Sequence, residues 1–161
     1  LESDIPIVFV LYGDICNIHD IVGRLKQAGK IVIIHLDLVT GLSSKEIAVT
    51  YLHAVTHGDG IISTKPGIIR KAKEEGMLAI MRFFVIDSIA SESIQKQVEN
   101  VHPDMIEILP GLMPKVIKKI CGKSHIPVIA GGLITDKEDI MAALGAGAIS
   151  ISTTNQKVWF M

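Results

Sequence analysis

Seven short apolar runs alternate with amphipathic segments along the whole chain. The runs begin near residues 5, 31, 60, 78, 105, 127 and 148, and each of the first six precedes a segment with helical periodicity. Such alternation is typical of a parallel sheet whose strands are joined by right-handed helical crossovers. The residues are 48% hydrophobic and only 4% aromatic, which suits parallel strands because both their faces are covered. We therefore predict an α/β fold built on parallel strands.

The same pattern predicts where the elements lie. Strands are expected at 5–12, 31–39, 60–64, 78–85, 105–109, 127–130 and 148–152. Helices are expected at 17–29, from 43 onward, at 68–75, 89–101 and 113–121, and from about 136 onward. Ser43 and Glu46 have the spacing of a capping box, which predicts the start of the second helix.

The number of strand–helix units favours an eight-unit barrel that lacks one unit. The strands are about 24 residues apart, so a complete (β/α)8 barrel would need about 190 residues, whereas the chain has 161. Leu1 to Asp4 have the pattern of a helix tail leading into a strand. We expect one domain over residues 1–161, a (β/α)8 TIM-type barrel whose first βα unit is missing from this sequence through truncation or disorder. For a complete chain an open doubly wound sheet is the better interpretation, and strand order separates the two.

The stretch from Ile126 to Asn155 predicts a phosphate-binding βαβ unit. An apolar strand ends in Gly131 and Gly132, and the next strand ends in Ser152, Thr153 and Thr154. Glycine lets backbone N–H groups approach an anion closely, and α/β barrels often bind phosphate in the loops after their last two strands. The alternative is that the glycines only allow a tight turn between strand and helix.

Polar residues at other strand ends complete the expected site. His35 and Asp37 should point to the same side of the strand at 31–39, because side chains alternate along a strand. Lys65 follows the next strand, and Arg82 and Glu107 lie within apolar strands. A buried arginine needs an anion, so Arg82 either forms an internal ion pair with Asp37 or Glu107 or contacts a ligand. Both alternatives are left open.

Charge, cysteine and histidine content narrow the classes of function. A formal net charge of −1 gives no overall attraction to nucleic acid, so an RNA contact would need a local basic patch. No run approaches the roughly 18 to 20 apolar residues of a membrane span, and no signal peptide opens the chain, so we expect a cytoplasmic protein. Cys16 and Cys121 are far apart, and His53 and His57, at i and i+4, are expected to be solvated. We expect no metal and no cofactor.

Several stretches resemble one protein family. They are HLDLVTGLSSKE (35–46), DGIISTK (59–65), MRFFVIDS (81–88), IEILPGLMPKVIKKI (106–120), IPVIAGGLITDKEDI (126–140) and AISISTTNQKVW (148–159). Together they resemble the glycerol uptake operon antiterminator, the bacterial glycerol-3-phosphate-responsive regulatory protein. The resemblance implies a small (β/α)8 barrel that binds glycerol 3-phosphate and acts on the leader mRNA of glycerol-utilisation genes, allowing transcription past a terminator. Members of the family carry an additional N-terminal strand and helix.

The resemblance gives the expected site its ligand. Gly131, Gly132, Ser152, Thr153 and Thr154 would hold the phosphate of glycerol 3-phosphate, mainly through backbone N–H groups. Asp37 and Glu107 suit the two hydroxyls, Lys65 or Arg82 suits charge balance, and His35 completes the ligand residues.

The sequence leaves open which surface contacts RNA and whether the protein is a regulator or an enzyme. The candidate RNA patch comprises Lys115, Lys118, Lys119 and Lys123, and a second basic concentration comprises Arg70, Lys71 and Lys73. The alternative to a regulator is a TIM-barrel enzyme acting on a small phosphorylated sugar or glycerol derivative, with His35, Asp37, Lys65 and Glu107 as acid, base or Schiff-base groups. The resemblance favours the regulator, and no nucleophile motif or metal-ligand cluster emerges from the spacing; without the resemblance an enzyme would be favoured, because barrels that bind phosphate usually are enzymes. The expected partners are therefore glycerol 3-phosphate and leader mRNA, without a membrane, and a homo-oligomeric state is left open.

Overall fold

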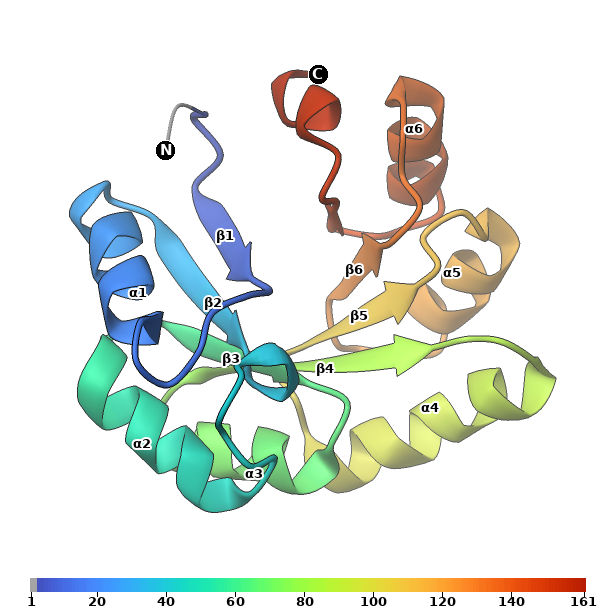
Figure 1. Cartoon of the computed structure of the whole chain (residues 1–161). Coiled ribbons are helices and arrows are strands. Elements are labelled where there is room, and N and C mark those ends of the chain that lie inside the picture. Colours follow the sequence, from blue (N-terminus) through green and yellow to red (C-terminus); the bar gives the residue numbers. More distant parts are fainter. Residues whose placement is uncertain (1–2) are drawn as a thin grey trace. The chain divides into compact units, whose positions relative to one another are not determined.

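The computed structural model describes residues 3–161 and confirms the α/β class. Strands and helices alternate along the chain (Figure 1). The strands are β1 (Ile7–Val10), β2 (Ile31–His35), β3 (Gly60–Ser63), β4 (Leu78–Phe84), β5 (Met105–Leu109), β6 (Val128–Gly131) and β7 (Ser150–Ser152). The helices are α1 (Ile18–Gln27), α2 (Glu46–Thr56), α3 (Pro66–Glu74), α4 (Ser88–Val101), α5 (Pro114–Cys121) and α6 (Lys137–Gly145), with short 3₁₀ helices at Leu36–Leu38 and Gln156–Phe160.

All the described strand pairs are parallel, and strand neighbours follow the order of the chain from β1 to β7. This order is that of consecutive βα units in α/β barrels and differs from the order of a doubly wound sheet, in which the direction of winding reverses. The expectation of a missing first βα unit stays a prediction. Its helix-tail pattern falls partly on Leu1 and Glu2, outside the described residues, while Ser3 and Asp4 are not helical.

The chain divides into two compact units, Leu1–Met81 and Arg82–Met161, with the boundary inside β4. In the first unit β1, β2, β3 and the start of β4 pair in register, as at Gly60 opposite Leu78. In the second unit Ile106 pairs with Val128 and Ile129 with Ser150. The prediction of one domain over residues 1–161 stays a prediction.

Burial of the strands explains the aliphatic sequence. Three consecutive residues of β2, Val32, Ile33 and Ile34, are each 0% exposed, and Val128 to Ala130 of β6 are buried as well. Side chains on both faces of β2 and β6 are therefore covered, as in parallel strands between helices, whereas β1 and β7 are partly exposed. The apolar runs of β2 and β6 are continuous in the sequence because neither face of these two strands is exposed to solvent.

Two predicted details are wrong. The strand from residue 31 ends at His35, and Leu36–Leu38 forms a 3₁₀ turn, so His35 and Asp37 do not alternate along one strand. The helix expected to begin at a capping box has Lys45 as its N-cap, with no side-chain hydrogen bond, and Ser43 only accepts through its carbonyl from the N–H of Lys45. By contrast, the helix expected from about residue 136 onward is α6, and Asp136 is its N-cap, accepting from the N–H of Asp139 at 2.9 Å.

His53 and His57 are both exposed, as predicted. Nδ1 of His53 lies 3.4 Å from Oε2 of Glu75, and His57 ends α2 in the left-handed conformation. Within residues 3–161 no three histidine, cysteine or acidic side chains are arranged to hold a metal ion. Cys16 and Cys121 are both free thiols, and burial raises the pKa of the Cys121 thiol. The helices of the described part are all too short or too polar to cross a membrane.

Candidate functional site

A buried ion pair joins β4 and β5 within the second unit. Nε of Arg82 lies 2.5 Å from Oε2 of Glu107, whose side chain is 0% exposed, while the Arg82 side chain is 11% exposed. Two charges can be buried in a sheet only when they are paired and hydrogen-bonded. Of the alternatives that the sequence left open for Arg82, the internal ion pair is present, and its partner is Glu107.

Ser152 forms a hydrogen bond with the other oxygen of the Glu107 carboxylate. Its hydroxyl donates to Oε1 of Glu107 at 2.5 Å, so the carboxylate joins β4, β5 and β7. Gly131 lies against this cluster, and a Cβ there would meet Oγ of Ser152 at 2.5 Å and Oε1 of Glu107 at 2.8 Å. Glycine is therefore required at residue 131 by the close approach of polar side chains. Both oxygens of Glu107 are engaged internally, which suits a residue that orients Arg82 and Ser152.

The loop after β6 turns sharply and presents its backbone. Gly132 has φ +75° and Leu133 has φ 62°, so two consecutive residues adopt the left-handed conformation. Leu133 is 68% exposed, and a leucine in this conformation is strained. The carbonyl of Gly132 accepts from the N–H of Gly111, but within the described residues no backbone carbonyl accepts from the N–H of Gly132 or Leu133. These two donors can therefore bind an anion.

The N-terminus of the following helix is already satisfied. Oδ1 of Asp136 accepts from the N–H of Asp139, and Oδ2 of Asp139 accepts from the N–H and the hydroxyl of Thr135 at 2.9 and 3.1 Å. Two carboxylates thus occupy the positive end of the α6 dipole, where an anion would otherwise be stabilised. Any phosphate near this loop must use the amides that precede the helix.

The three residues that end β7 have different surroundings. Thr153 donates its hydroxyl to the carbonyl of Ile134 and accepts from the N–H of Asn155, at 3.0 and 3.1 Å. Its carbonyl accepts from Nε1 of Trp159 at 2.9 Å, which fixes the turn leading into the last 3₁₀ helix. Thr154 is exposed. The hydroxyls of Ser152 and Thr153 hold the fold together, and Thr154 is the one of the three whose side chain faces solvent.

The first unit contains a second polar cluster, around Asp37. Oδ2 of Asp37 accepts from the hydroxyl of Ser63 at 2.7 Å and from the N–H of Thr64 at 3.3 Å, and Oδ1 lies 3.4 Å from Nζ of Lys65. Burial raises the pKa of Asp37, but the hydrogen bonds from Ser63 and Thr64, together with the charge of Lys65, outweigh it and hold the pKa below its ordinary value. Asp37 is therefore ionised at neutral pH and acts as an acceptor.

The structure thus assigns the predicted ligand residues to two groups, each within one unit. Asp37 and Lys65 are brought together in the first unit, and buried His35 ends β2 there. Arg82, Glu107, Gly131 and Ser152 are brought together in the second unit. Sequence reasoning missed Ser63, whose buried hydroxyl links Asp37 to the loop after β3 by also accepting from the N–H of Lys65. Its position at the end of the strand GIIS was the available signal.

Comparison with known proteins decides the family. The model of the family described as "Glycerol-3-phosphate responsive antiterminator" matches residues 1–159. The chain belongs to this antiterminator family. The resemblance found in the sequence is thereby confirmed, and the strand-end clusters are those of an antiterminator-family protein.

Individual relatives of this antiterminator-family chain agree in sequence and in structure. The uncharacterized protein YgcP of Escherichia coli (strain K12) is 48% identical over 159 residues, covering 99% of this chain and 83% of YgcP. A glycerol uptake operon antiterminator regulatory protein from Listeria monocytogenes str. 4b F2365 superposes with a TM-score of 0.95 at 40% identity, covering 99% of this chain and 86% of the other. A glycerol uptake operon antiterminator-related protein from Thermotoga maritima MSB8 superposes with a TM-score of 0.87 at 36% identity, covering 97% of this chain and 88% of the other.

The antiterminator fold is shared with an enzyme. Orotidine 5′-phosphate decarboxylase from Pyrococcus horikoshii OT3 superposes with a TM-score of 0.72 at 18% identity, over 98% of this chain and 80% of the decarboxylase. At this identity only the fold is common to the two proteins, because one scaffold carries many unrelated functions.

Proposed function

We propose that this protein senses glycerol 3-phosphate and binds the leader mRNA of glycerol-utilisation genes, allowing transcription to continue past a terminator. Membership of the antiterminator family supports the class of function. The observation that carries the ligand assignment is the loop after β6. There the N–H groups of Gly132 and Leu133 have no backbone acceptor among residues 3–161, and they lie beside Gly131, which a larger residue could not replace.

The phosphate end of the ligand fits the second unit. Amides of Gly132 and Leu133 donate to phosphate oxygens, and the backbone at Thr153 and the exposed Thr154 supplies further donors from the end of β7. Arg82 contributes positive charge, since Glu107 engages its Nε and leaves the rest of the guanidinium for other acceptors. Gly131, Gly132, Ser152, Thr153 and Thr154 are thus retained as the proposed phosphate residues, with Ser152 and Thr153 acting through the backbone they position.

The first unit contains the other group of predicted ligand residues. The ionised carboxylate of Asp37 accepts hydrogen bonds from hydroxyls, and Lys65, half exposed, supplies positive charge. We retain Asp37, Lys65 and His35 as proposed ligand residues.

The electrostatics favour binding over catalysis. A general acid must be protonated at working pH, but the pKa of Asp37 is lowered, and Glu107 is engaged by Arg82 and Ser152. A regulator needs only that the ligand bind one state of the protein better than another. We propose this role for the cytoplasm, with glycerol 3-phosphate and leader mRNA as partners and a further copy of the chain as an additional partner to be tested by sedimentation.

Replacing Gly132 with valine tests the phosphate loop. Valine disfavours φ +75°, and its Cβ would lie 3.2 Å from Cδ2 of Leu109, so the amides should move out of position. We expect isothermal titration calorimetry to show an affinity for glycerol 3-phosphate at least about 100-fold weaker, equivalent to about 2.7 kcal/mol.

Gly76 provides the matched control. It has φ +74° and no neighbour within 4 Å of an added Cβ, and it follows α3, away from the loop after β6 in sequence. Gly76→Val should suffer similar backbone strain but bind glycerol 3-phosphate as the unmodified protein does. Undiminished affinity in a folded Gly132→Val variant would exclude the proposed phosphate loop.

A further inference from the structure

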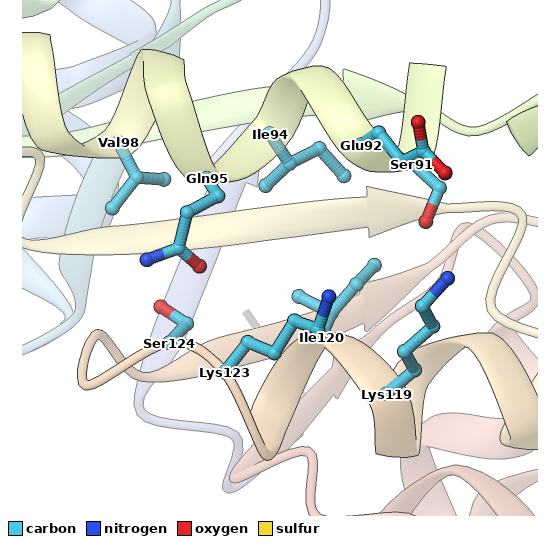
Figure 2. Close-up of a pocket in the computed structure, with 9 residues that line it drawn as sticks. All are labelled: Ser91, Glu92, Ile94, Gln95, Val98, Lys119, Ile120, Lys123 and Ser124. Carbon is cyan, nitrogen blue, oxygen red and sulfur yellow. The ribbon is translucent and has the colours of Figure 1, made fainter. Parts of the chain in front are cut away.

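A groove lies between α4 and α5 in the second unit (Figure 2). Its apolar floor is formed by Ile94, Val98 and Ile120, each less than 10% exposed. Ser91, Glu92 and Gln95 of α4 form one polar edge, and Lys119 and Lys123 form the other. In Figure 2 the Lys119 side chain extends toward Ser91 and Glu92, and Gln95 points across the groove toward Ser124. An apolar hollow with a few polar groups at its edges has the composition of a ligand site.

The basic edge of the groove is part of a longer row of lysines. Lys115, Lys118, Lys119 and Lys123 are all exposed, and their spacing of three, four and eight residues places them on one face of α5 and its continuation. Among the ion pairs of the described residues none involves these four side chains. The opposite face of α5 is buried through Ile117 and Ile120.

The other basic cluster, Arg70, Lys71 and Lys73, is partly compensated. On α3, Nζ of Lys71 lies 2.9 Å from Oε1 of Glu75 and 3.6 Å from Oε2 of Glu74. Because neighbouring carboxylates neutralise Lys71, fewer uncompensated charges are available to an RNA backbone on α3 than on α5. With a chain net charge of −1, the uncompensated row on α5 is the local patch that association with a polyanion requires.

The α4 edge adds groups that can contact a nucleobase. Nε2 of Gln95 donates to Oε1 of Glu99 at 2.8 Å, and this hydrogen bond orients the Gln95 amide. The amide oxygen and the second N–H of Gln95 stay available to bind a base. Glu92 is an exposed acceptor opposite Lys119. Proteins that recognise RNA by sequence bind unstacked bases from loops and bulges through hydrogen bonds to their edges and apolar contact with their faces.

We propose that the α4–α5 groove is the RNA-contact surface: the lysine row binds consecutive phosphates, and an unpaired base enters the hollow between Gln95 and Ile120. This inference rests on the proposed function, because it takes leader mRNA as the partner. At a helical rise of about 1.5 Å per residue the row from Lys115 to Lys123 extends about 12 Å, which is long enough to contact more than one phosphate of an RNA strand. The regular spacing of the lysines and the apolar hollow beside them together favour RNA over an acidic protein segment.

Salt dependence of RNA binding tests the lysine edge. Binding of the labelled leader RNA of the glycerol-utilisation operon is followed by fluorescence anisotropy from low to moderate KCl, with glycerol 3-phosphate present. The Lys119→Gln/Lys123→Gln variant should lower the magnitude of the slope of log K against log [KCl] by about 1.4, because each lost single-strand phosphate contact contributes about 0.7. At 100 mM KCl the affinity should fall about tenfold or more.

The matched control removes the same charge elsewhere in the second unit. Lys96 on α4 and Lys137 on α6 are exposed and do not line the groove. Lys96→Gln/Lys137→Gln should retain the slope and affinity of the unmodified protein, and unchanged thermal unfolding establishes that both double variants are folded.

Two glutamines of α4 test the hollow itself. Gln95 lines the groove, whereas Gln97 donates to Oγ of Ser93 at 3.3 Å and does not line it. Gln95→Ala should weaken RNA binding about fivefold, the size of one hydrogen bond, without altering the salt slope. Gln97→Ala should have no effect.

The outcomes separate this inference from the function on which it rests. If the unmodified protein binds leader RNA but the Lys119/Lys123 variant keeps its affinity and slope, the groove is excluded and the proposed function stands. If the unmodified protein binds no leader RNA with or without glycerol 3-phosphate, both are overturned. Equal weakening by the groove pair and by the Lys96/Lys137 pair would show a diffuse charge effect and would also overturn the groove.

Discussion

Replacing Glu107 with alanine is expected to lower the free energy of unfolding by about 3–5 kcal/mol. The carboxylate is 0% exposed and binds both Arg82 and Ser152, at 2.5 Å each. Its removal leaves the Arg82 side chain, which is 11% exposed, without a counter-ion. It also leaves the Ser152 hydroxyl without its acceptor. Urea denaturation measures the loss.

Two variants serve as controls for Glu107→Ala: one replaces an exposed glutamate, and the other replaces both members of the buried ion pair. Glu138 is an exposed residue in the first turn of α6, and Glu138→Ala should cost no more than about 1 kcal/mol. Removing both charges in Arg82→Met/Glu107→Leu should cost much less than Glu107→Ala, because a buried ion pair can often be replaced by apolar side chains at little cost. If Glu107→Ala were as mild as Glu138→Ala, the buried ion pair would not hold the strands together.

Gly131→Ala is expected to have the second-largest effect on stability, about 1–3 kcal/mol. The added Cβ would lie 2.5 Å from Oγ of Ser152 and 2.8 Å from Oε1 of Glu107. Neither neighbour can retreat without lengthening the hydrogen bond that joins them. The same displacement should weaken binding of glycerol 3-phosphate, because Gly131 leads directly into the phosphate loop.

Gly145→Ala provides the comparison for Gly131→Ala. Gly145 ends α6, and a Cβ there meets nothing within 4 Å, so alanine should leave stability unchanged or raise it by up to about 1 kcal/mol. Combining Gly131→Ala with Ser152→Ala should cost less than the sum of the two single changes, since the closest contact is then absent. Strict additivity would contradict the proposed crowding at Ser152.

Much of the fold could be predicted because a strand that is buried on both faces has a continuous run of apolar residues in the sequence. The strand at 105–109 and the start of α6 near residue 136 were located correctly from an apolar run and from helical periodicity. The capping box at Ser43 failed because its residue types and spacing do not determine which residue takes the N-cap conformation, and here Lys45 takes it.

The site was less predictable because its contacts are long-range. Asp37 looked like a strand residue beside His35, but the strand ends first and its carboxylate instead accepts from Ser63, 26 residues away. Choosing Glu107 as the partner of Arg82 required knowing which strands neighbour each other. Ser152 and Thr153 have the right residue type for phosphate, yet their hydroxyls are used by Glu107 and Ile134.

The proposed function requires that binding of glycerol 3-phosphate and binding of leader mRNA to this protein be coupled. Thermodynamic linkage requires that each ligand change the affinity of the other by the same factor. Electrophoretic mobility shift with and without glycerol 3-phosphate gives one side of the cycle, and calorimetry of glycerol 3-phosphate with and without leader RNA gives the other. Product analysis of the same mixtures detects turnover.

We expect an equal change of about five- to 150-fold on both sides of the cycle, with glycerol 3-phosphate recovered unaltered. Identical RNA affinity with and without glycerol 3-phosphate, or conversion of glycerol 3-phosphate to product, would contradict the account.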